Sequence, residues 1–471
     1  MPCWRQAPPV RVLAIGFVAA AVLATSAQDS PRQVSLVVSG GTVVTMNAGG
    51  DVIPDGAIAI DGTDIVAVGD AAAVAAAFRG RETIDASGQI VLPGLVNTHT
   101  HAPMVLYRGL ADDLPLQTWL EQFIFPAEAR TVSPEFVRAG TRLAALEMIQ
   151  SGTTTFADMY YFEEEVANEA REAGLRGVLG QTVIQFPVPD APTPADGLAR
   201  ADAFIVAFKG DPLITPAVAP HALYTLDGPM LKAARALAVR HAVPTLIHLA
   251  ETRDETRVAR ERLKASPVAY LDSLGFLGAG IVAAHGIWVS DADIAVLASR
   301  GVGIAHNPES NMKLASGTAP VPAYLNAGVP VGIGTDGAAS NNDLDMFEAM
   351  RMTALLHKLE ADDPAVLSAR TTLEMATIGG ARVLGLDRRI GSIEPRKRAD
   401  LIVVSLAGAR QTPVYDPLSH LVYVARGDDV RDSVVNGRVL MRDRRVLTLD
   451  ETAVIADSLT WADRVRAALE P

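Results

Sequence analysis

The chain has 471 residues, 49% of them hydrophobic and 20% charged, which suits one large barrel-sized domain together with a small one. Its formal net charge is −13 and it contains no basic run, so nucleic-acid binding through phosphate neutralisation is not expected. The single cysteine, Cys3, lies near the N-terminus, which excludes disulfides, thiolate metal sites and cysteine nucleophiles from the rest of the chain.

The first 27 residues have the pattern of a secretory signal peptide. Arg5 and Arg11 precede the apolar stretch VLAIGFVAAAVL at 12–23, and the small residues of ATSAQDS follow it. The apolar stretch is short for a membrane span, although an uncleaved or interfacial anchor is an alternative. We therefore expect residues 1–27 to be a signal peptide, the mature chain to begin near Gln28, and the protein to be exported to the periplasm.

Short strands broken by turns are expected on both flanks of the chain. Residues 34–91 contain segments such as SLVVSGGTVVTM and GAIAIDGTDIVAVG, and residues 391–450 return to the same style in ADLIVVSL and VRDSVVNGRVL. We interpret the two flanks, 34–91 and 391–450, as one small β-sandwich domain built from both ends of the chain.

Strands and helices alternate in the central part of the chain. Eight apolar, strand-like runs occur, and helical segments separate most of them. The runs are IVLPGLVNTHT, TTTFADM, RGVLGQTVI, LITPAVAP, PTLIHLA, GIVAAHG, GVGIAH and VPVGIGTD. This alternation predicts an α/β fold, a (β/α)8 barrel over residues 92–390. The proline-rich FPVPDAPTPADG at 186–197 is expected to form a loop over the barrel mouth.

Polar side chains recur where these runs end, and the C-terminal ends of barrel strands are where active sites lie. They are His99 and His101 in the first run, Asp158 in the second, His221 after the fourth, His248 and then Glu251 at the fifth, His285 in the sixth, His306 in the seventh and Asp336 in the eighth. Alternate residues of a strand share a face, so His99 and His101 should converge. That pair alone would also fit two solvated histidines, and the other strand ends favour a functional site.

A transition metal is the expected occupant of this site. Nitrogen and oxygen ligands suit a catalytic zinc or iron, and His99, His101, His248 and Asp336 can supply them. The first and eighth strands adjoin in a closed barrel, which places Asp336 beside the paired histidines. No lysine ends the fourth run, so a bridging carboxylated lysine is absent there. We therefore expect one divalent metal per chain, zinc, with iron as the alternative.

The motifs VLPGLVNTHTH, HLAE, AHG, AHNPESNMKL and GIGTDG together resemble the amidohydrolase superfamily. The stretch HAPMVLYRGLADDLPLQTWLEQFIFPAEA is similar to the branch of 5-methylthioadenosine/S-adenosylhomocysteine deaminases, and the resemblance covers nearly all of 34–450. It implies one metal held by the four residues named above, with Glu251 as general acid and base. It also implies that His285 orients the water and the developing oxyanion, that Glu128 in FPAEA holds the ribose hydroxyls, and that His221 contacts the substrate.

The chemistry can also be followed from the residues. A metal can lower the pKa of bound water to about 7, which gives hydroxide at neutral pH. Asp336 can accept the water proton, and Glu251 can protonate a ring nitrogen, so that both carboxyls also contact the substrate. Addition of hydroxide and loss of ammonia follow. We expect a metal-dependent hydrolytic deaminase of an adenine nucleoside, with a purine nucleoside or related heterocycle as its small-molecule partner, and a homo-oligomer is left open.

Other functions remain as alternatives. A guanine-type deaminase or a triazine hydrolase, which break other ring C–N or C–Cl bonds, would use the same metal site. An inactive barrel that serves as a scaffold should have lost metal ligands, and none is missing here. Two features depart from the family pattern: the export signal, and the region GQTVIQFPVPDAPTPADGLAR, in which Arg200 is the first arginine and no clamp for an amino-acid group can be matched.

Overall fold

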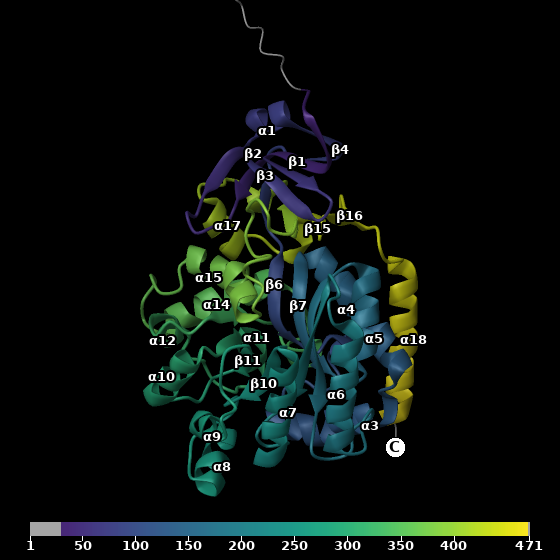
Figure 1. Cartoon of the computed structure of the whole chain (residues 1–471), viewed down its shortest axis with the longest axis vertical. Helices are drawn as coiled ribbons and strands as arrows, with labels where there is room; N and C mark the ends of the chain where they lie inside the picture. Colours follow the sequence, from purple (N-terminus) through teal and green to yellow (C-terminus); the bar gives the residue numbers. More distant parts are fainter. Residues whose placement is uncertain (1–29, 470–471) are drawn as a thin grey trace, which may run out of the picture.

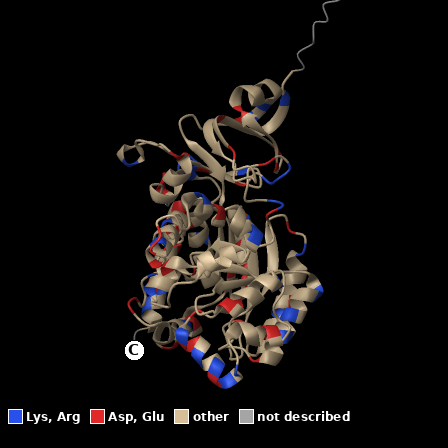
Figure 2. Cartoon of the chain, turned by 90° about the vertical axis from the view of Figure 1, so that its left-hand side faces the viewer, with Lys and Arg blue, Asp and Glu red and all other residues tan. Residues whose placement is uncertain are grey.

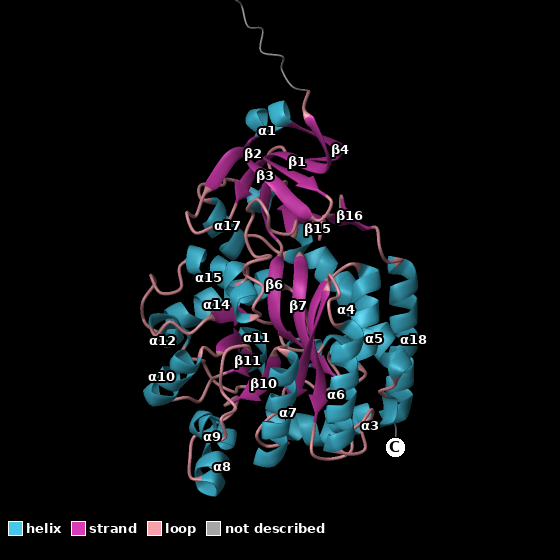
Figure 3. Cartoon of the chain, viewed as in Figure 1, coloured by secondary structure: helices cyan, strands magenta, loops and turns pink. Residues whose placement is uncertain are grey.

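The computed structural model describes residues 30–469, so the predicted signal peptide lies outside the described residues. Two sheets organise the fold, one of eight strands and one of nine (Figure 3). In Figure 1 the nine-stranded sheet, built from the purple and yellow-green ends of the chain, lies above the eight-stranded one.

The eight-stranded sheet forms the barrel, with its strands parallel and in chain order. The strands are β6 (Leu95–Thr100), β7 (Thr153–Tyr160), β8 (Arg176–Val183), β9 (Ile214–Pro220), β10 (Thr245–Leu249), β11 (Ile281–His285), β12 (Gly303–His306) and β13 (Val331–Ile333). Asn97 Nδ2 donates to Thr335 Oγ1 at 2.8 Å and the Asp336 amide donates to the His99 carbonyl at 2.9 Å, so the last strand meets the first. Each of the eight predicted runs supplies one strand of the barrel, and the predicted barrel is confirmed.

Helices cover the outside of the barrel, and residues that favour helix termini mark where they begin and end. For example, Ser133 caps the first turn of α4, Pro134 follows at its first position, and Gly152 ends it with φ of 89°. The helical segments are η1 (Ala102–Tyr107), α2 (Leu116–Trp119), η2 (Leu120–Ile124), α3 (Phe125–Thr131), α4 (Pro134–Ser151), α5 (Glu163–Ala173), α6 (Pro194–Phe208), α7 (Gly228–His241), α8 (Arg253–Leu263), α9 (Pro267–Ser273), α10 (Asp291–Arg300), α11 (Pro308–Lys313), α12 (Val321–Asn326), α13 (Ala338–Asn341), α14 (Met346–Glu360), α15 (Ala369–Met375) and α16 (Ile378–Val383).

The nine-stranded mixed sheet joins the two ends of the chain. Its strands are β1 (Arg32–Val44), β2 (Val52–Asp61), β3 (Asp64–Asp70), β4 (Phe78–Asp85), β5 (Ile90–Pro93), β14 (Leu401–Val404), β15 (Val430–Val435), β16 (Arg438–Arg442) and β17 (Arg445–Val446). The antiparallel pairing of β5 with β14 connects the two halves. The first predicted run is therefore divided, since β5 belongs to this sheet and β6 to the barrel. Gly94 lies between them where a Cβ would come within 2.1 Å of the Thr154 side chain.

A buried ion pair connects the two sheets. Arg176, the first residue of β8, donates from Nε to Asp400 Oδ2 at 2.8 Å and from Nη2 to Oδ1 at 3.1 Å, and Asp400 directly precedes β14. The mixed sheet thus adjoins the N-terminal ends of the barrel strands. Their C-terminal ends face away from it, toward the end of the molecule where α3, α8 and α9 lie (Figure 1).

The remaining elements complete the outer layer. They are α1 (Ala71–Ala77), η3 (Ala409–Gln411), α17 (Pro417–Tyr423), η4 (Gly427–Asp429) and α18 (Glu451–Leu469). The C-terminal helix α18 runs beside α4, with Trp461 edge-on to Phe136 at a centroid distance of 5.5 Å. Charged residues of both signs lie mostly on the outer helices and loops (Figure 2). No helix within residues 30–469 is long and apolar enough to cross a membrane.

Candidate active site

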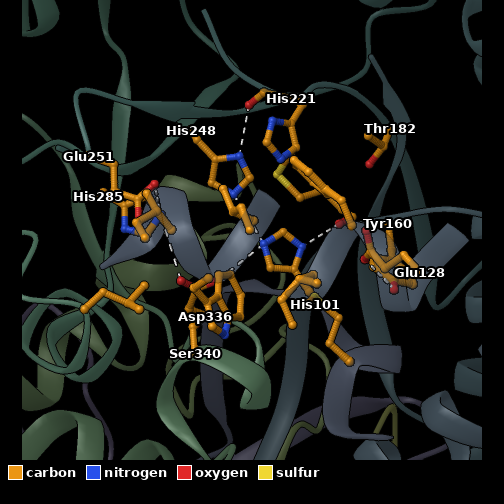
Figure 4. A pocket seen from close by; sticks show the side chains of 18 of the residues that line it. His101, Glu128, Tyr160, Thr182, His221, His248, Glu251, His285, Asp336 and Ser340 are labelled. Carbon is orange, nitrogen blue, oxygen red and sulfur yellow. Dashed lines mark hydrogen bonds and ion pairs between the residues drawn. The ribbon is translucent and has the colours of Figure 1, made fainter. Parts of the chain in front are cut away.

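A pocket opens at the C-terminal ends of the barrel strands. The predicted site residues His101, Glu128, His221, His248, Glu251, His285 and Asp336 all line it (Figure 4). His99 is buried beside them, with its ring centroid 4.9 Å from that of His101. The structure therefore brings together all eight residues to which the sequence analysis assigned a role in metal binding, catalysis or substrate contact.

Three imidazoles and one carboxylate converge in this pocket. Ligand atoms of His99, His101 and His248 lie within 4.8 Å of one another. Asp336 Oδ1 is 3.4 Å from His99 Nε2 and 3.3 Å from His101 Nε2. Nε2 of His99 is buried without a hydrogen-bond partner, which is costly unless a ligand occupies it. Three nitrogens and one oxygen with an open side fit a catalytic divalent metal.

Hydrogen bonds behind the cluster orient two of these imidazoles. His101 Nδ1 is 2.7 Å from the Met159 carbonyl oxygen, and His248 Nδ1 is 3.0 Å from that of His221. Each Nδ1 must carry the proton, because a carbonyl only accepts, so each Nε2 presents its lone pair to the cluster. The arrangement prepares the histidines as ligands.

Protonation states in the cluster also suit metal binding. Burial lowers the pKa of His99 to about 4 and lowers the pKa of His248 well below its usual value, so both rings are neutral at pH 7. Burial alone would raise the pKa of Asp336, but the adjacent imidazoles, His99 first and then His285 and His101, hold it well below the ordinary range. Neutral imidazole and ionised carboxylate are the forms that coordinate metals.

The Asp336 backbone is held in a rarely used conformation. Its φ is 65°, in the left-handed region, and its Oδ1 accepts from the Gly337 amide at 2.8 Å. Ser310 Oγ donates to Oδ2 at 2.7 Å. Two residues earlier, Gly334 allows β13 to lie against β6, since a Cβ there would come within 2.9 Å of the His99 amide nitrogen. Strained backbone of this kind concentrates where side-chain placement matters.

Glu251 and His285 lie next to each other beside the cluster. Glu251 is 4% exposed, and its Oε2 lies 3.9 Å from His285 Nε2. Burial raises the pKa of Glu251, although the nearby imidazoles oppose it. Burial would lower the pKa of His285, but the carboxylates of Glu251 and Asp336 raise it overall. A carboxyl that keeps its proton to higher pH is suited to act as a general acid.

Glu255, which the sequence reasoning did not single out, fixes the backbone that carries Glu251. Its Oε1 accepts from the Ala250 amide at 3.1 Å and its Oε2 from the Glu251 amide at 2.8 Å. These bonds hold Ala250 at φ of 50°, which turns the chain after β10. The Thr252-x-x-Glu255 spacing is that of a helix capping box and could have drawn attention to Glu255.

Glu128 lies across the pocket from Glu251 (Figure 4). It comes from α3, is 5% exposed and accepts a hydrogen bond from the Tyr160 hydroxyl at 2.7 Å. Burial raises the pKa of Glu128 to about 7, while hydrogen bonds from Tyr160 and Tyr161 oppose that rise. Tyr160 was missed in the sequence because its role depends on a contact between β7 and α3, which no local pattern announces.

Two polar residues at strand ends do not line the pocket. Asp158 Oδ1 accepts from Thr100 Oγ1 at 2.6 Å and from the Ala102 amide, and so supports the chain around His101 from behind. His306 is buried with its Nε2 3.2 Å from that of His357. Their positions indicate structural roles.

The other predicted substrate contact, His221, does line the pocket. Its Nδ1 is 3.1 Å from Thr225 Oγ1, and burial lowers its pKa to about 3. It is therefore a neutral hydrogen-bonding group at pH 7.

An α/β barrel with a buried histidine–aspartate cluster at the C-terminal ends of its strands defines the class of metal-dependent barrel hydrolases. A family model described as "Amidohydrolase family" matches residues 90–440. The chain belongs to the amidohydrolase family.

Several relatives match almost the whole chain. A 5-methylthioadenosine/S-adenosylhomocysteine deaminase from Syntrophobacter fumaroxidans is 49% identical over 89% of this chain and 96% of its own. A 5′-deoxyadenosine deaminase from Methanococcoides burtonii is 44% identical over 90% and 96%, respectively. A zinc-bound crystal structure of an adenosine deaminase from Xanthomonas campestris has a TM-score of 0.91 and 40% identity over 93% of this chain and all of that one. A zinc complex of an atrazine chlorohydrolase from Arthrobacter aurescens TC1 gives a TM-score of 0.83 at 26% identity, over 91% of this chain and all of that one.

Proposed function

We propose that this chain is a metal-dependent hydrolytic deaminase of adenine nucleosides, which replaces the adenine amino group with oxygen and releases ammonia. The observation that carries the proposal is a pair of buried carboxyls at opposite ends of one pocket, Glu251 beside the histidine cluster and Glu128 across from it. One suits proton transfer to a heterocycle, and the other suits hydrogen bonds from sugar hydroxyls. Relatives at 40–49% identity bear the names of adenine nucleoside deaminases, whereas the triazine-type relative is 26% identical.

The same proposal includes one divalent metal per chain, zinc, held by His99, His101, His248 and Asp336. The donor set, the orphaned His99 Nε2 and the zinc in the two solved relatives support it. When bound, such a metal lowers the pKa of a water molecule toward about 7 and so supplies a nucleophile at neutral pH.

The residues of the chain then have separate tasks. Asp336, ionised through its histidine neighbours, accepts the proton that the attacking water loses. Glu251 donates a proton to a ring nitrogen, which makes the adjacent ring carbon electrophilic. Asp336 passes the water proton to the amino group, and as the C–N bond breaks and ammonia leaves, the hydroxyl proton of the adduct returns to Glu251. His285 donates from Nε2 toward the oxygen where negative charge develops. Positioned donors of this kind act most strongly in buried, water-excluded sites.

We also propose that the protein is exported to the periplasm after removal of residues 1–27. The order of Arg5, Arg11, the apolar stretch at 12–23 and the small residues near Ala27 supports this.

The function is tested by ammonia release from adenosine, 5′-methylthioadenosine, S-adenosylhomocysteine, guanine and a chlorinated triazine. We expect turnover of at least one adenine nucleoside and none of guanine or the triazine. The Asp336→Ala variant serves as the inactive control. Turnover confined to guanine or to the triazine would show that the proposal names the wrong substrate class.

A further inference from the structure

The wall of the pocket around Glu128 differs chemically from the metal-binding end. Its side chains come from one continuous helical stretch, α2 to α3, together with the end of β7. The apolar and aromatic members are Leu116, Trp119, Leu120, Ile124, Phe125 and Tyr160. Phe186, in the loop after β8, packs edge-on against Phe125 at a centroid distance of 5.7 Å and extends this aromatic surface.

This wall faces the 5′ end of a bound nucleoside if the proposed function is correct, and the inference rests on that function. The heterocycle must reach Glu251, and the ribose hydroxyls then reach Glu128 on the opposite side (Figure 4). The 5′ carbon is bonded directly to the ribose ring, so its substituent contacts side chains that neighbour Glu128. Trp119 and Ile124, which are 6% and 1% exposed, offer this substituent a dry surface.

Among the described residues that line the pocket there are three acids, Glu128, Glu251 and Asp336, and neither lysine nor arginine. A substituent that carries a carboxylate would lose its hydration without gaining a cationic partner, and it would approach these acids. Desolvation of an unpaired charge is strongly unfavourable.

Two cations elsewhere around the barrel mouth already have partners. Lys313 Nζ is 2.6 Å from Asp112, and Arg200 is 2.5 Å from Glu164 and 3.3 Å from Asp190. Arg262 lines a neighbouring hollow that shares Leu116 and Tyr224 with this pocket, but acids line that hollow too. None of these three side chains lines the pocket that contains the aromatic wall.

We propose that this site selects adenine nucleosides with an uncharged 5′ substituent, such as methylthio, hydrogen or hydroxyl, and discriminates against an amino-acid zwitterion at that position. The discrimination is one of charge, because the apolar wall can accept a longer alkyl chain. The residues that determine it are those of α2 to α3 that face Glu128.

The test compares three thioethers that separate charge from length. They are 5′-methylthioadenosine, 5′-butylthioadenosine and S-adenosylhomocysteine, of which the last two have four-carbon chains and differ in the ionic groups. We expect kcat/KM for the two alkyl compounds to agree within about tenfold, and the value for S-adenosylhomocysteine to be at least about 100-fold below that for the butyl compound. The Arg262→Ala variant should show the same ratios as the unaltered protein.

Comparable kcat/KM for S-adenosylhomocysteine and the butyl compound would overturn the inference. So would slow turnover of both, because length rather than charge would then limit access. A selective loss of S-adenosylhomocysteine turnover in Arg262→Ala would show that a cation does hold the zwitterion, and would likewise refute it. Failure of the proposed function looks different, since no adenine nucleoside would then be deaminated.

Discussion

Replacement of Glu251 by glutamine tests the assignment of the proton donor. The substitution keeps the volume of the side chain and its capacity for hydrogen bonds, but it removes the titrating group. Glu251 is 4% exposed, so bulk water cannot easily take over its proton transfer. Its position two residues beyond β10 is set by backbone bonds to Glu255, which the substitution leaves intact.

The size of the effect follows from the role. Loss of a positioned acid–base group lowers kcat by about 10² to 10⁴, which corresponds to roughly 3–5 kcal/mol of transition-state free energy. Glu251 makes no hydrogen bond or ion pair with His99, His101 or His248, so metal content should remain near that of the unaltered protein. Because the raised pKa of Glu251 keeps its proton available to higher pH, kcat/KM of the unaltered protein should fall as pH rises through that pKa. This decrease of kcat/KM with rising pH should be absent in the Glu251→Gln variant.

The assay is ammonia release over a pH series, with metal content measured on the same preparations. Glu261→Gln is a matched control, since it makes the same substitution on α8 at a side chain that is 59% exposed and does not line the pocket. If Glu251→Gln loses its metal, the residue is a ligand and the assigned coordination is wrong. If kcat changes by less than about tenfold, ring protonation by Glu251 is not part of the reaction.

Four further outcomes can be measured. Asp336→Ala should abolish both metal binding and activity, and elemental analysis of the unaltered protein should give one metal per chain, whereas two would refute the mononuclear site. Glu128→Ala should raise KM for nucleosides by about 10², because two hydrogen bonds to a carboxylate are lost, and should change little for a free base, which steady-state kinetics on both substrates will show. Asp400→Asn leaves Arg176, which is 2% exposed, without its ionic partner and should lower the free energy of unfolding by about 3–5 kcal/mol in denaturant titrations, so an unchanged midpoint would argue against that ion pair. N-terminal sequencing of the protein from the periplasm should begin near Gln28, and an intact Met1 on cytosolic protein would contradict export.

Much of the barrel could be predicted because its strands are covered on both faces. Parallel strands enclosed in this way are continuous apolar runs, as in β11 (Ile281–His285), and they are easily separated from the amphipathic helices. The metal cluster could be predicted for a related reason. His99, His101 and Asp336 are each fixed by position at a strand end, so chain order alone places them together.

Other features depend on contacts that no local pattern records. The division of the first run into β5 and β6 follows from the pairing of β5 with β14, some 300 residues later in the chain. The hydrogen bond from Tyr160 to Glu128 likewise joins the strand β7 to the helix α3, which are not adjacent in the sequence. The helix α18 was not predicted. It packs against the outer surface of α4, and the sequence alone does not show the shape of that surface.

Three carboxyl groups in one pocket can perform three tasks because their surroundings differ. Asp336 is ionised, since the adjacent imidazoles outweigh its burial, and it can therefore accept a proton or bind a cation. Glu251 is buried with only partial compensation from His285, so it retains a proton more readily and can act as an acid. Glu128 lies across the pocket from Glu251, where burial raises its pKa to about 7 although hydrogen bonds from tyrosine hydroxyls oppose the rise.

Each hydroxyl of a bound ribose would add a further donor to the Glu128 carboxyl and favour its ionised form, so nucleoside binding and loss of the Glu128 proton should be coupled. Affinity for nucleosides should therefore weaken below about pH 7, where Glu128 holds a proton in the free protein, and Glu128→Gln should remove that part of the pH dependence. Nucleoside KM values that vary with pH equally in the two proteins would show that the titrating group lies elsewhere.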